Sequence, residues 1–332
     1  MDRIERLFWQ NVPVRFFDWT GATAALGTPE LQDELLARLH LVPSEQEIPA
    51  AAHRPKAAAA YVVRFLKALI ERLEREGVEL SEALYELLAE TAVSVAGDGE
   101  PECDRCYFLP PAPGTQTPVS GRRLERIVLR EHVAEISQGT TGLRTWQASL
   151  RLVEHLSAHR EVVAGRRIVE LGAGVGLLGL ACRLLGAASV HMTDVDDAVL
   201  ARLAGNVAIN NLGDSVRTSR LDWEEVGNGD IGTLHLDPFD MIIAADVVFA
   251  PELIGPLVRK ITCLLRAAAE PPLAECWVAS TRRRESTFGM FTDELAAAGL
   301  TVESVAASPA SWYFYDEGAD SVDISRIYFA TA

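Results

Sequence analysis

The sequence predicts an α/β fold in which a small helical domain precedes a doubly wound sheet. Three features of the 332 residues predict it. From Ile168 onward, short apolar runs alternate with helix-length segments; acidic residues follow several of these runs; and before residue 100 the apolar residues recur at helical spacing instead. Such alternation is typical of a sheet with helices on both faces. A chain of this length fits two domains, which we place at residues 1–100 and 101–332.

The first domain is predicted to consist of helices. Apolar residues keep the spacing of one helix face over residues 56–73, and Gly77 follows as the expected C-cap. Thr28 is a candidate N-cap with Pro29 at the first helical position, and a further helix is expected over residues 81–95. We find no glycine loop or ligand cluster in this part of the sequence. Structural support and recognition of a partner are therefore the functions open to it.

A segment rich in Gly, Pro and Asp, residues 97–121, is interpreted as a boundary. Short strands at Tyr107–Leu109 and Arg126–Leu129 are predicted to pair around it. The polar, glycine-punctuated segment Ser137–Trp146 then leads into an amphipathic helix. At this junction Trp146 either flanks a ligand pocket or packs into the core, which is the commoner position of a tryptophan.

The doubly wound sheet is predicted from five apolar runs separated by helical segments. They lie near residues 168–171, 189–193, 216–221, 240–245 and 276–280. Sheets of this kind bind ligands outside the carboxyl ends of their strands. The residues that follow each run are therefore the first candidates for a functional site.

The most informative of these strand ends is a glycine-rich loop. Residues 168–171 run directly into glycines at 172, 174 and 176, and a helix-forming segment follows. Glycine lets the backbone turn sharply and approach a ligand without an intervening Cβ atom. Glu170 places a carboxylate at the end of the same strand. The arrangement indicates a site of nucleotide size.

The second strand end indicates that the ligand contains adenosine. Asp194 follows the strand at 189–193, where a carboxylate can accept hydrogen bonds from both hydroxyls of a ribose. Two cofactor classes contain such a group and fit a glycine loop: nicotinamide dinucleotides and S-adenosyl-L-methionine.

The register of the glycines favours S-adenosyl-L-methionine. A formal dinucleotide motif exists at Gly174, Gly176 and Gly179. In that motif, however, the first glycine comes directly after the strand, and here Gly172 holds this place. Counting from Gly172, the third glycine of the motif is replaced by Leu177.

The later strand ends add an aromatic residue and two further acids. Asp222 and Trp223 follow the third strand and offer an acceptor for an adenine amine and a wall for its ring, although an aspartate after a strand often only caps the next turn. We favour the functional interpretation because of the neighbouring strand ends. The fourth strand ends at Ala245 and Asp246, and Phe249 follows shortly after.

The charge of the chain bears on its partners. Lys and Arg number 31 against 47 Asp and Glu, which gives a net charge of −16. Such a protein repels phosphate backbones, so nucleic acid is not expected as a partner. The same charge also serves solubility, and this second explanation is equally open.

Composition also indicates the compartment. Five scattered cysteines do not make a disulfide framework, and residues 1–10 contain acids and no apolar core of a signal peptide. No apolar run has the length of a membrane span. Cys103 and Cys106 lack a second cysteine or histidine pair, so we expect no metal site. A cytoplasmic protein is expected.

Together these motifs resemble the seven-stranded class I methyltransferases, which have a Rossmann-like domain. Glu170–Gly174, Asp194, Leu221–Trp223 and Ala244–Phe249 resemble in particular the protein lysine methyltransferases marked by an Asp-x-x-Tyr motif. Within that family the helical first domain and two further segments are similar to the members that act on eukaryotic elongation factor 2. These segments are Gly139–Trp146 and Asn206–Asn210. The similarity covers most of the chain and is strongest from Ser137 to Pro251.

The resemblance implies an S-adenosyl-L-methionine-dependent protein-lysine N-methyltransferase that acts on elongation factor 2, most simply as a monomer. It implies a cofactor pocket lined by Trp146, Gly172, Ala173, Gly174, Trp223 and Ala245, with Asp194 on the ribose. Glu170 and Asp222 complete the set of cofactor candidates from the strand ends. Asp246 and Phe249 are the candidates for the catalytic site, facing the substrate lysine.

One residue departs from the family pattern. Phe249 stands where the family usually has tyrosine. A phenyl ring preserves an aromatic wall but not a hydrogen bond. If the family needs that hydroxyl, Tyr313 or Tyr315 would have to supply it, although these two residues also fit ordinary packing.

The family closes its sheet with an antiparallel hairpin, which gives the strand order 3-2-1-4-5-7-6. Leu300–Val305 and Val322–Phe329 are the expected hairpin strands. Their connection, Ser308–Ala319, is expected to lie over the active-site edge, where long loops often recognise substrate.

Three other functions remain open at this point. A lysine methyltransferase that acts on another protein, such as a chaperone, would share the cofactor residues. A small-molecule methyltransferase is disfavoured by the helical domain and the acidic surface. A non-catalytic module that binds the cofactor is kept open by Phe249.

Overall fold

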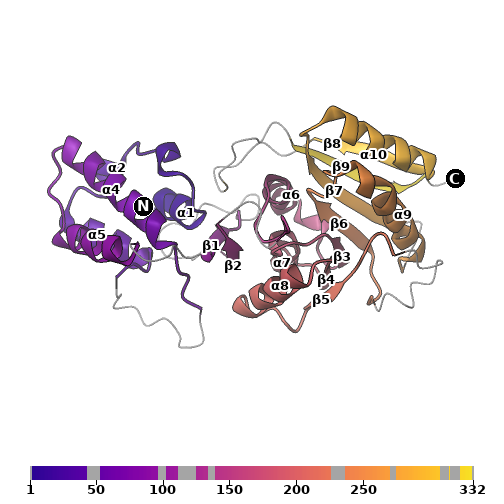
Figure 1. Cartoon of the computed structure of the whole chain (residues 1–332), viewed down its shortest axis with the longest axis horizontal. Helices are drawn as coiled ribbons and strands as arrows, with labels where there is room; N and C mark the ends of the chain where they lie inside the picture. Colours follow the sequence, from indigo (N-terminus) through magenta and orange to yellow (C-terminus); the bar gives the residue numbers. More distant parts are fainter. Residues whose placement is uncertain are drawn as a thin grey trace. The chain divides into compact units, whose positions relative to one another are not determined.

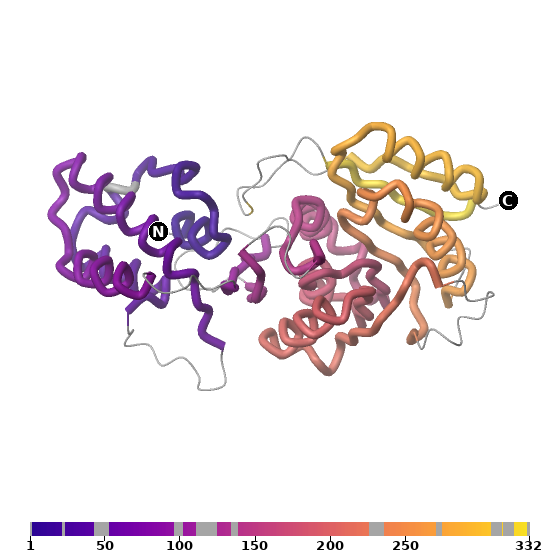
Figure 2. Tube along the Cα trace, in the orientation of Figure 1, coloured from indigo at the N-terminus to yellow at the C-terminus, as the bar shows by residue number. Residues whose placement is uncertain are grey.

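The computed structural model describes residues 2–42, 53–95, 102–110, 125–133, 139–225, 236–269, 274–306, 314 and 322–330, which form two compact units. The first comprises Met1–Phe108, Val128–Ala134 and Tyr313–Tyr315; the second comprises Leu109–Ile127, Glu135–Trp312 and Asp316–Ala332. Figure 2 traces both along the chain. The first unit therefore takes in one strand and most of a second beyond residue 100, and our boundary between domains stays a prediction.

The first unit is built mainly from helices, as predicted. They are α1 (Asp2–Trp9), a 3-10 turn at Val14–Phe16, α2 (Ala22–Ala25), α3 (Pro29–Arg38), α4 (Ala59–Arg75) and α5 (Glu82–Val95). The start of α3 at Pro29 confirms the predicted N-terminus, although the side chain of Thr28 makes no capping hydrogen bond. Gly77 follows α4 with a φ of 71°, the left-handed backbone expected of a C-cap.

The core of the first unit forms where α4 meets α1. The buried face of α4 carries the predicted apolar residues, including Phe65. Phe8 of α1 lies against two α4 rings, with centroids 5.4 Å from Tyr61 and 4.8 Å from Phe65. Buried aromatic pairs of this kind stabilise a fold beyond the area that they bury.

A two-stranded sheet belongs to the same unit. It pairs β1 (Glu102–Phe108) with β2 (Arg126–His132), which confirms the predicted pairing. Asp104 is buried in β1, where it accepts hydrogen bonds from Arg130 Nε at 3.0 Å and from the Lys56 backbone N–H at 3.0 Å. Both Cys103 and Cys106 are buried free thiols in this strand, and burial raises the pKa of Cys103.

The second unit contains a seven-stranded sheet. Its strands are β3 (Arg167–Leu171), β4 (Ser189–Asp194), β5 (Val216–Arg220), β6 (Met241–Ala245), β7 (Glu275–Thr281), β8 (Leu300–Val305) and β9 (Val322–Phe329). They lie in the order β5-β4-β3-β6-β7-β9-β8, which is the predicted 3-2-1-4-5-7-6. The first five strands in this order are parallel to one another, and β9 runs antiparallel to both β7 and β8.

Helices cover both faces of this sheet (Figure 1). They are α6 (Gln147–Ala158), α7 (Leu177–Leu184), α8 (Asp197–Ile209), α9 (Pro251–Ala267) and α10 (Glu285–Ala297), with a 3-10 turn at Arg160–Val162. Val169 and Leu171 of β3 pack in one apolar cluster with α9 and α10. Because side chains alternate along a strand, Ile168 and Glu170 point to the opposite face, toward α7. This explains why the strands are apolar on both sides.

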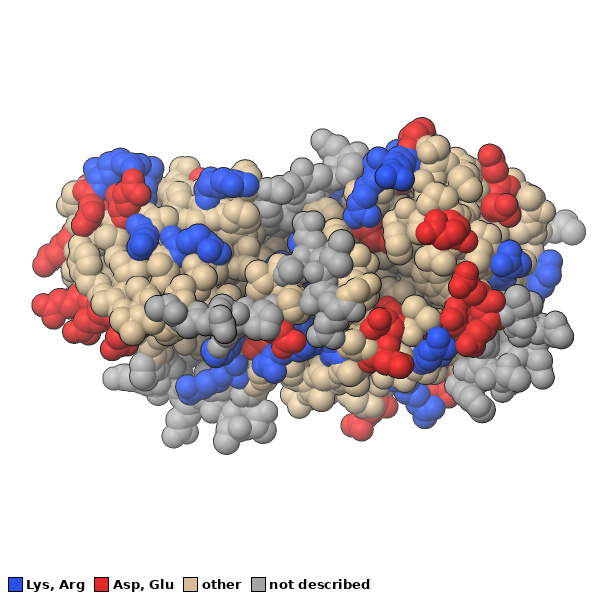
Figure 3. Space-filling model, viewed as in Figure 1, with Lys and Arg blue, Asp and Glu red and all other residues tan. Residues whose placement is uncertain are grey.

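Two further properties of the described residues concern the distribution of charge on the surface and the apolar character of the helices. On the face shown in Figure 3, acidic and basic side chains are interspersed, so the acidic excess does not form one continuous block there. None of the helices within the described ranges has both the length and the apolar character needed to cross a bilayer.

Candidate functional site

The predicted site residues come together because the register of the sheet aligns three strand ends. Leu171 at the end of β3 pairs with Thr193 of β4 on one side and with Ala244 of β6 on the other. The next residues along each strand are Gly172, Asp194 and Ala245. These three therefore lie at one edge of the sheet, where doubly wound folds bind ligands.

Asp194 is bonded to the glycine loop. Its Oδ2 accepts a hydrogen bond of 3.0 Å from the Gly174 N–H, and its Oδ1 accepts from the N–H groups of Val195 at 2.8 Å and Asp196 at 3.2 Å. Burial raises the pKa of Asp194, and the three backbone donors oppose this rise. A carboxylate has about four lone-pair positions, so Oδ2 keeps acceptor capacity for a hydroxyl.

Gly172 brings the glycine loop against an aromatic ring. Its φ is 64°, which an L-residue with a side chain rarely adopts. A Cβ atom here would lie 3.0 Å from Val247 Cγ1 and 3.3 Å from Trp223 Cζ2. Trp223 is partly buried against the core of the α9 face, so its ring forms a wall beside the loop.

Gly174 contacts a second loop, the one that precedes α6. With a φ of 55°, Gly174 would place a Cβ atom 3.1 Å from the carbonyl oxygen of Gly142. The neighbouring Thr141 carbonyl accepts a hydrogen bond of 2.9 Å from Trp146 Nε1. Ala173, between the two glycines, donates its N–H to the Thr193 carbonyl at 2.8 Å. The loop before α6 thus places Trp146 near the glycine loop.

Trp146 lies between two arginines. The guanidinium carbon of Arg144 is 5.2 Å from the ring centroid, and that of Arg283 is 5.1 Å from it. Guanidinium groups at this distance are attracted to the face of an indole ring. Trp146 is only partly buried at the start of α6, and its contact with the cofactor stays a prediction.

Asp246 follows β6 in an unusual backbone conformation. Its φ is 56°, and its N–H donates to the Ala279 carbonyl at 2.9 Å. Its side chain, 7% exposed, accepts at Oδ1 from the Thr281 N–H (3.2 Å), and at Oδ2 from Thr281 Oγ1 (3.2 Å) and Arg283 (3.3 Å). Left-handed backbone at a non-glycine residue costs free energy and persists where neighbouring contacts hold it.

Phe249 is exposed on the same segment. Its side chain is 48% exposed, whereas Val247 and Val248 just before it are buried. An exposed aromatic ring three residues after Asp246 is free to contact a substrate. The two tyrosines considered as substitutes, Tyr313 and Tyr315, lie outside the described residues, as does the connection Ser308–Ala319 apart from Phe314. The described Phe314 packs on Tyr107 of β1, with ring centroids 6.2 Å apart.

Glu170 is buried against α7. Its Oε2 lies so close to Gly179 of α7 that a Cβ atom there would collide with it. Burial raises the pKa of this carboxyl group well above its usual value, opposed by a hydrogen bond from the Gly179 backbone. The carboxyl group thus lies against the first turn of α7, and direct contact of Glu170 with the cofactor stays a prediction.

Asp222 has local partners. Its Oδ1 accepts a hydrogen bond of 2.9 Å from the Glu224 N–H, and its Oδ2 lies 3.3 Å from Arg220. The first bond is the turn-capping interaction that we weighed against a ligand contact. A role of Asp222 toward adenine stays a prediction.

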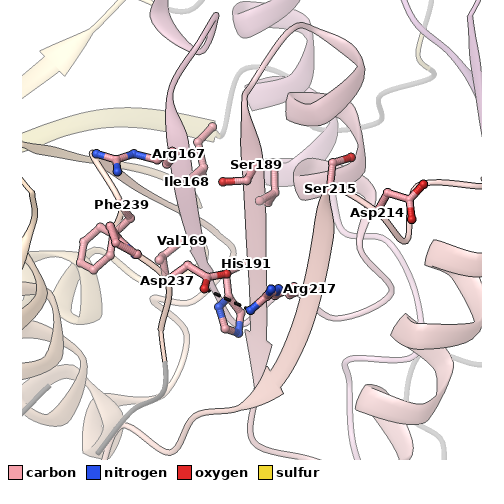
Figure 4. A pocket seen from close by; sticks show the side chains of 12 residues that line it. Arg167, Ile168, Val169, Ser189, His191, Asp214, Ser215, Arg217, Asp237 and Phe239 are labelled. Carbon is pink, nitrogen blue, oxygen red and sulfur yellow. Dashed lines mark hydrogen bonds and ion pairs between the residues drawn. The ribbon is translucent and has the colours of Figure 1, made fainter. Parts of the chain in front are cut away.

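The described residues also outline a pocket at the opposite end of the strands (Figure 4). It is lined by the starts of β3, β4 and β5, and Arg217 pairs with Asp237 across it at 3.1 Å. His191, whose pKa is lowered by burial, bonds Ser219 within the sheet. Because α/β sheets bind ligands at the carboxyl ends of their strands, we do not place the cofactor here.

Sequence reasoning missed Thr281, Arg283 and Arg144. Thr281 ends β7 and Arg283 follows it, so the rule applied to the other strand ends would have found both. Arg144 carried no comparable signal, because its part depends on the position of the Trp146 ring.

The chain is similar to known proteins over most of its length. A family model described as lysine methyltransferase matches residues 128–295. The protein-lysine N-methyltransferase EEF2KMT of Homo sapiens is 34% identical over 318 residues, which cover 91% of this chain and 89% of that protein. The EEF2KMT of Mus musculus is 30% identical and covers 96% of this chain and 91% of its own length.

Solved structures resemble the chain at a greater distance. The ribosomal protein L11 methylase of Lactobacillus delbrueckii subsp. bulgaricus is 16% identical, with a TM-score of 0.38, and covers 55% of this chain and 78% of its own.

Proposed function

Because this chain belongs to the lysine methyltransferase family and is an S-adenosyl-L-methionine-dependent protein-lysine N-methyltransferase, we propose that its substrate is a lysine of eukaryotic elongation factor 2. The observation that carries the proposal is the extent of the similarity. It covers 96% of the chain with one relative, and so includes the helical first unit as well as the sheet that carries the cofactor residues. A target shared with these relatives is the simplest explanation of such full-length similarity.

The residues at the sheet edge fit the cofactor. Gly172 and Gly174 let the loop pass close to its neighbours, because a Cβ atom at Gly172 would meet Val247 and Trp223, and one at Gly174 would meet the Gly142 carbonyl. Asp194 keeps acceptor capacity for ribose, and Trp223 offers a wall to the adenine ring. When bound, S-adenosyl-L-methionine supplies an electrophilic methyl group on a sulfonium. We assign Trp146, Ala173 and Ala245 to the remaining wall of this pocket.

For transfer, the attacking lysine must be a neutral amine. A free lysine has a pKa of about 10.4, so the site has to favour loss of its proton. Partial desolvation and a nearby cation both lower a lysine pKa. We propose that Asp246 accepts a hydrogen bond from the amine and aims its lone pair, with Phe249 as an aromatic wall beside it. Asp246 is thus an orienting group and not an obligatory general base.

The first unit has no assigned chemistry, and we propose that it docks the protein substrate. We further propose a cytoplasmic monomer without a nucleic-acid partner, in keeping with the net charge of −16. Removing residues 1–96 tests the docking role. Unchanged activity on full-length elongation factor 2, in a folded remainder, would contradict it.

The proposed target is tested with isotope-labelled S-adenosyl-L-methionine, purified elongation factor 2 and a eukaryotic lysate. We expect label on one lysine of elongation factor 2, mapped by mass spectrometry and absent with Asp246→Asn. Label on a different protein, such as a chaperone, would replace the target and keep the chemistry. Absence of label in the presence of measurable cofactor binding would favour a non-catalytic module.

A further inference from the structure

One arginine joins the cofactor side of the site to its substrate side. A terminal nitrogen of Arg283 lies 3.3 Å from Oδ2 of Asp246, and its guanidinium carbon lies 5.1 Å from the Trp146 ring centroid. We propose that Arg283 is a positioning residue that neutralises the charge of the Asp246 carboxylate, so that the substrate lysine meets a hydrogen-bond acceptor and not a lone anion. This inference rests on the proposed function of Asp246.

The carboxylate is held by three hydrogen bonds, which leave one lone-pair position for a further donor. Thr281 donates its N–H to Oδ1 and its hydroxyl to Oδ2, and Arg283 donates to Oδ2. A carboxylate offers about four lone-pair positions, so these three bonds leave one. A lysine amine can occupy that position without displacing Arg283.

Charge explains why an arginine is useful beside this aspartate. A lone carboxylate favours the charged form of a lysine and raises its pKa, which opposes the loss of a proton needed for attack. An adjacent guanidinium cancels most of that field while leaving the oxygen able to accept a hydrogen bond. Arginine suits this task because it stays protonated at all relevant pH values.

The other charged groups near Asp246 do not take over this role. Arg282, from the same loop, is directed to Asp323 of β9 at 2.6 Å and to Glu285 of α10 at 3.3 Å. Arg144, before α6, lies over the Trp146 ring, which Arg283 also contacts.

Two acids of neighbouring segments have other surroundings. On the cofactor side, Asp194 accepts from three backbone N–H groups. Glu252, in the first turn of α9, is exposed. Among these groups Arg283 is the cation paired with Asp246.

The pH dependence of turnover tests the proposal. With saturating cofactor and elongation factor 2, kcat rises with pH as the bound lysine loses its proton. Arg283→Met keeps the length of the side chain and removes the charge. We expect it to move the midpoint of this rise upward by about one pH unit. A close charge changes a pKa by about 1–3 units, and the lower value applies because Arg283 is partly exposed. Turnover then falls about tenfold below the midpoint and recovers at high pH.

Two further variants separate charge from structure. Arg283→Lys keeps the charge and is expected to retain the wild-type midpoint. Arg282→Met removes a neighbouring charge that points away from Asp246 and is expected to leave the profile unchanged. An unshifted midpoint in Arg283→Met would overturn the proposal. So would a loss of turnover in Arg283→Met that is equal at every pH and that Arg283→Lys also shows.

The same series distinguishes this inference from the proposed function. If Asp246→Asn turns over like the wild type, the role assigned to Asp246 fails, and the inference fails with it. If Asp246→Asn is inactive but Arg283→Met keeps the wild-type midpoint, the inference alone fails. Cofactor affinity, measured by calorimetry for each variant, shows whether an effect passes through Trp146 instead. If Arg283→Met lowers only the cofactor affinity, Arg283 acts by holding the Trp146 ring, and its proposed role of neutralising Asp246 is contradicted.

Discussion

The backbone N–H of Gly174 donates a hydrogen bond of 3.0 Å to Oδ2 of Asp194, which ties the loop after β3 to the end of β4. The bond fixes two parts of the proposed cofactor site with a single interaction. The glycine loop cannot move away from the sheet edge without leaving a buried carboxylate oxygen short of a donor. Preorganisation of this kind lowers the cost of ordering the loop when a ligand binds.

Asp194→Asn is expected to weaken cofactor binding by about ten- to a hundredfold. An asparagine whose nitrogen replaces Oδ2 cannot accept from Gly174 or from a ribose hydroxyl, and a lost bond to a charged acceptor is worth about 1.5–3 kcal/mol. Calorimetric titration with S-adenosyl-L-methionine measures the change. Asp197→Asn, on the exposed first turn of α8, is the matched control and should bind normally.

Asp246→Asn is expected to reduce methyl transfer by at least about a hundredfold while cofactor affinity stays within about threefold of wild type. The amide keeps the size of the side chain and tolerates left-handed backbone, but it replaces one acceptor oxygen with a nitrogen that only donates. The site therefore loses either a bond that holds the side chain or the bond that orients the amine. Turnover with labelled cofactor and calorimetry give the two quantities. Asp293→Asn, on the exposed surface of α10, is the control. Turnover at the wild-type rate would remove Asp246 from the reaction.

The backbone of Asp246 gives a separate prediction about stability. Its φ of 56° suits glycine and strains alanine. Asp246→Gly should therefore unfold at a higher denaturant concentration than Asp246→Ala, with a difference in unfolding free energy of about 1 kcal/mol. Both variants lose the same side-chain bonds, so their comparison isolates the backbone. Equal stability would show that the loop relaxes to another conformation.

Phe249 is expected to act through its ring on the substrate and not through stability. Because the side chain is 48% exposed, Phe249→Ala should change the unfolding free energy by only about 0.5 kcal/mol. It should lower kcat/KM for the protein substrate by about tenfold, whereas Phe249→Tyr retains the aromatic wall and the activity. Met290→Ala, 44% exposed on α10, controls for loss of an exposed apolar side chain. A kcat/KM unchanged in Phe249→Ala would exclude contact with the substrate.

Glu170 makes stability depend on pH in an unusual direction. Because burial raises its folded-state pKa above the unfolded value, the folded protein holds one more proton in the window between the two. The free energy of unfolding therefore falls as pH rises through that window, by at most about 1.4 kcal/mol per pH unit. Glu170→Gln cannot ionise and should lose this dependence.

Denaturant unfolding from about pH 5 to pH 8 compares the two proteins. The stability of Glu170→Gln relative to wild type should increase with pH. Glu294→Gln, on the exposed surface of α10, should follow the wild type. Parallel curves for Glu170→Gln and wild type would mean that the carboxyl group is charged throughout.

The sheet could be predicted because its signals are local. Each parallel strand is a short apolar run, and a glycine or an acid follows several of them, so the strands and the residues at their ends can both be located. The strand order came from the family resemblance, since no single run of residues specifies that β9 lies between β7 and β8.

The contacts between loops could not be predicted in the same way. Arg282, Arg283 and Arg284 form a basic run that is typical of a solvated surface. Only the folded chain shows that Arg283 turns toward Asp246 while Arg282 turns toward Asp323. Burial of Asp104 was missed for the same reason, because its partners Arg130 and Lys56 come from distant parts of the sequence.

The position of β9 has a consequence for biosynthesis. The strand β9 lies between β7 and β8 and pairs with both, whereas β8 pairs with β9 alone. A ribosome makes Leu300–Val305 before Val322–Phe329, so the nascent β8 has to wait for a partner that is not yet synthesised. During that interval one edge of β7 is unprotected and can pair with another nascent chain. The β7 edge is therefore covered only after Val322–Phe329 has been made and is free to pair.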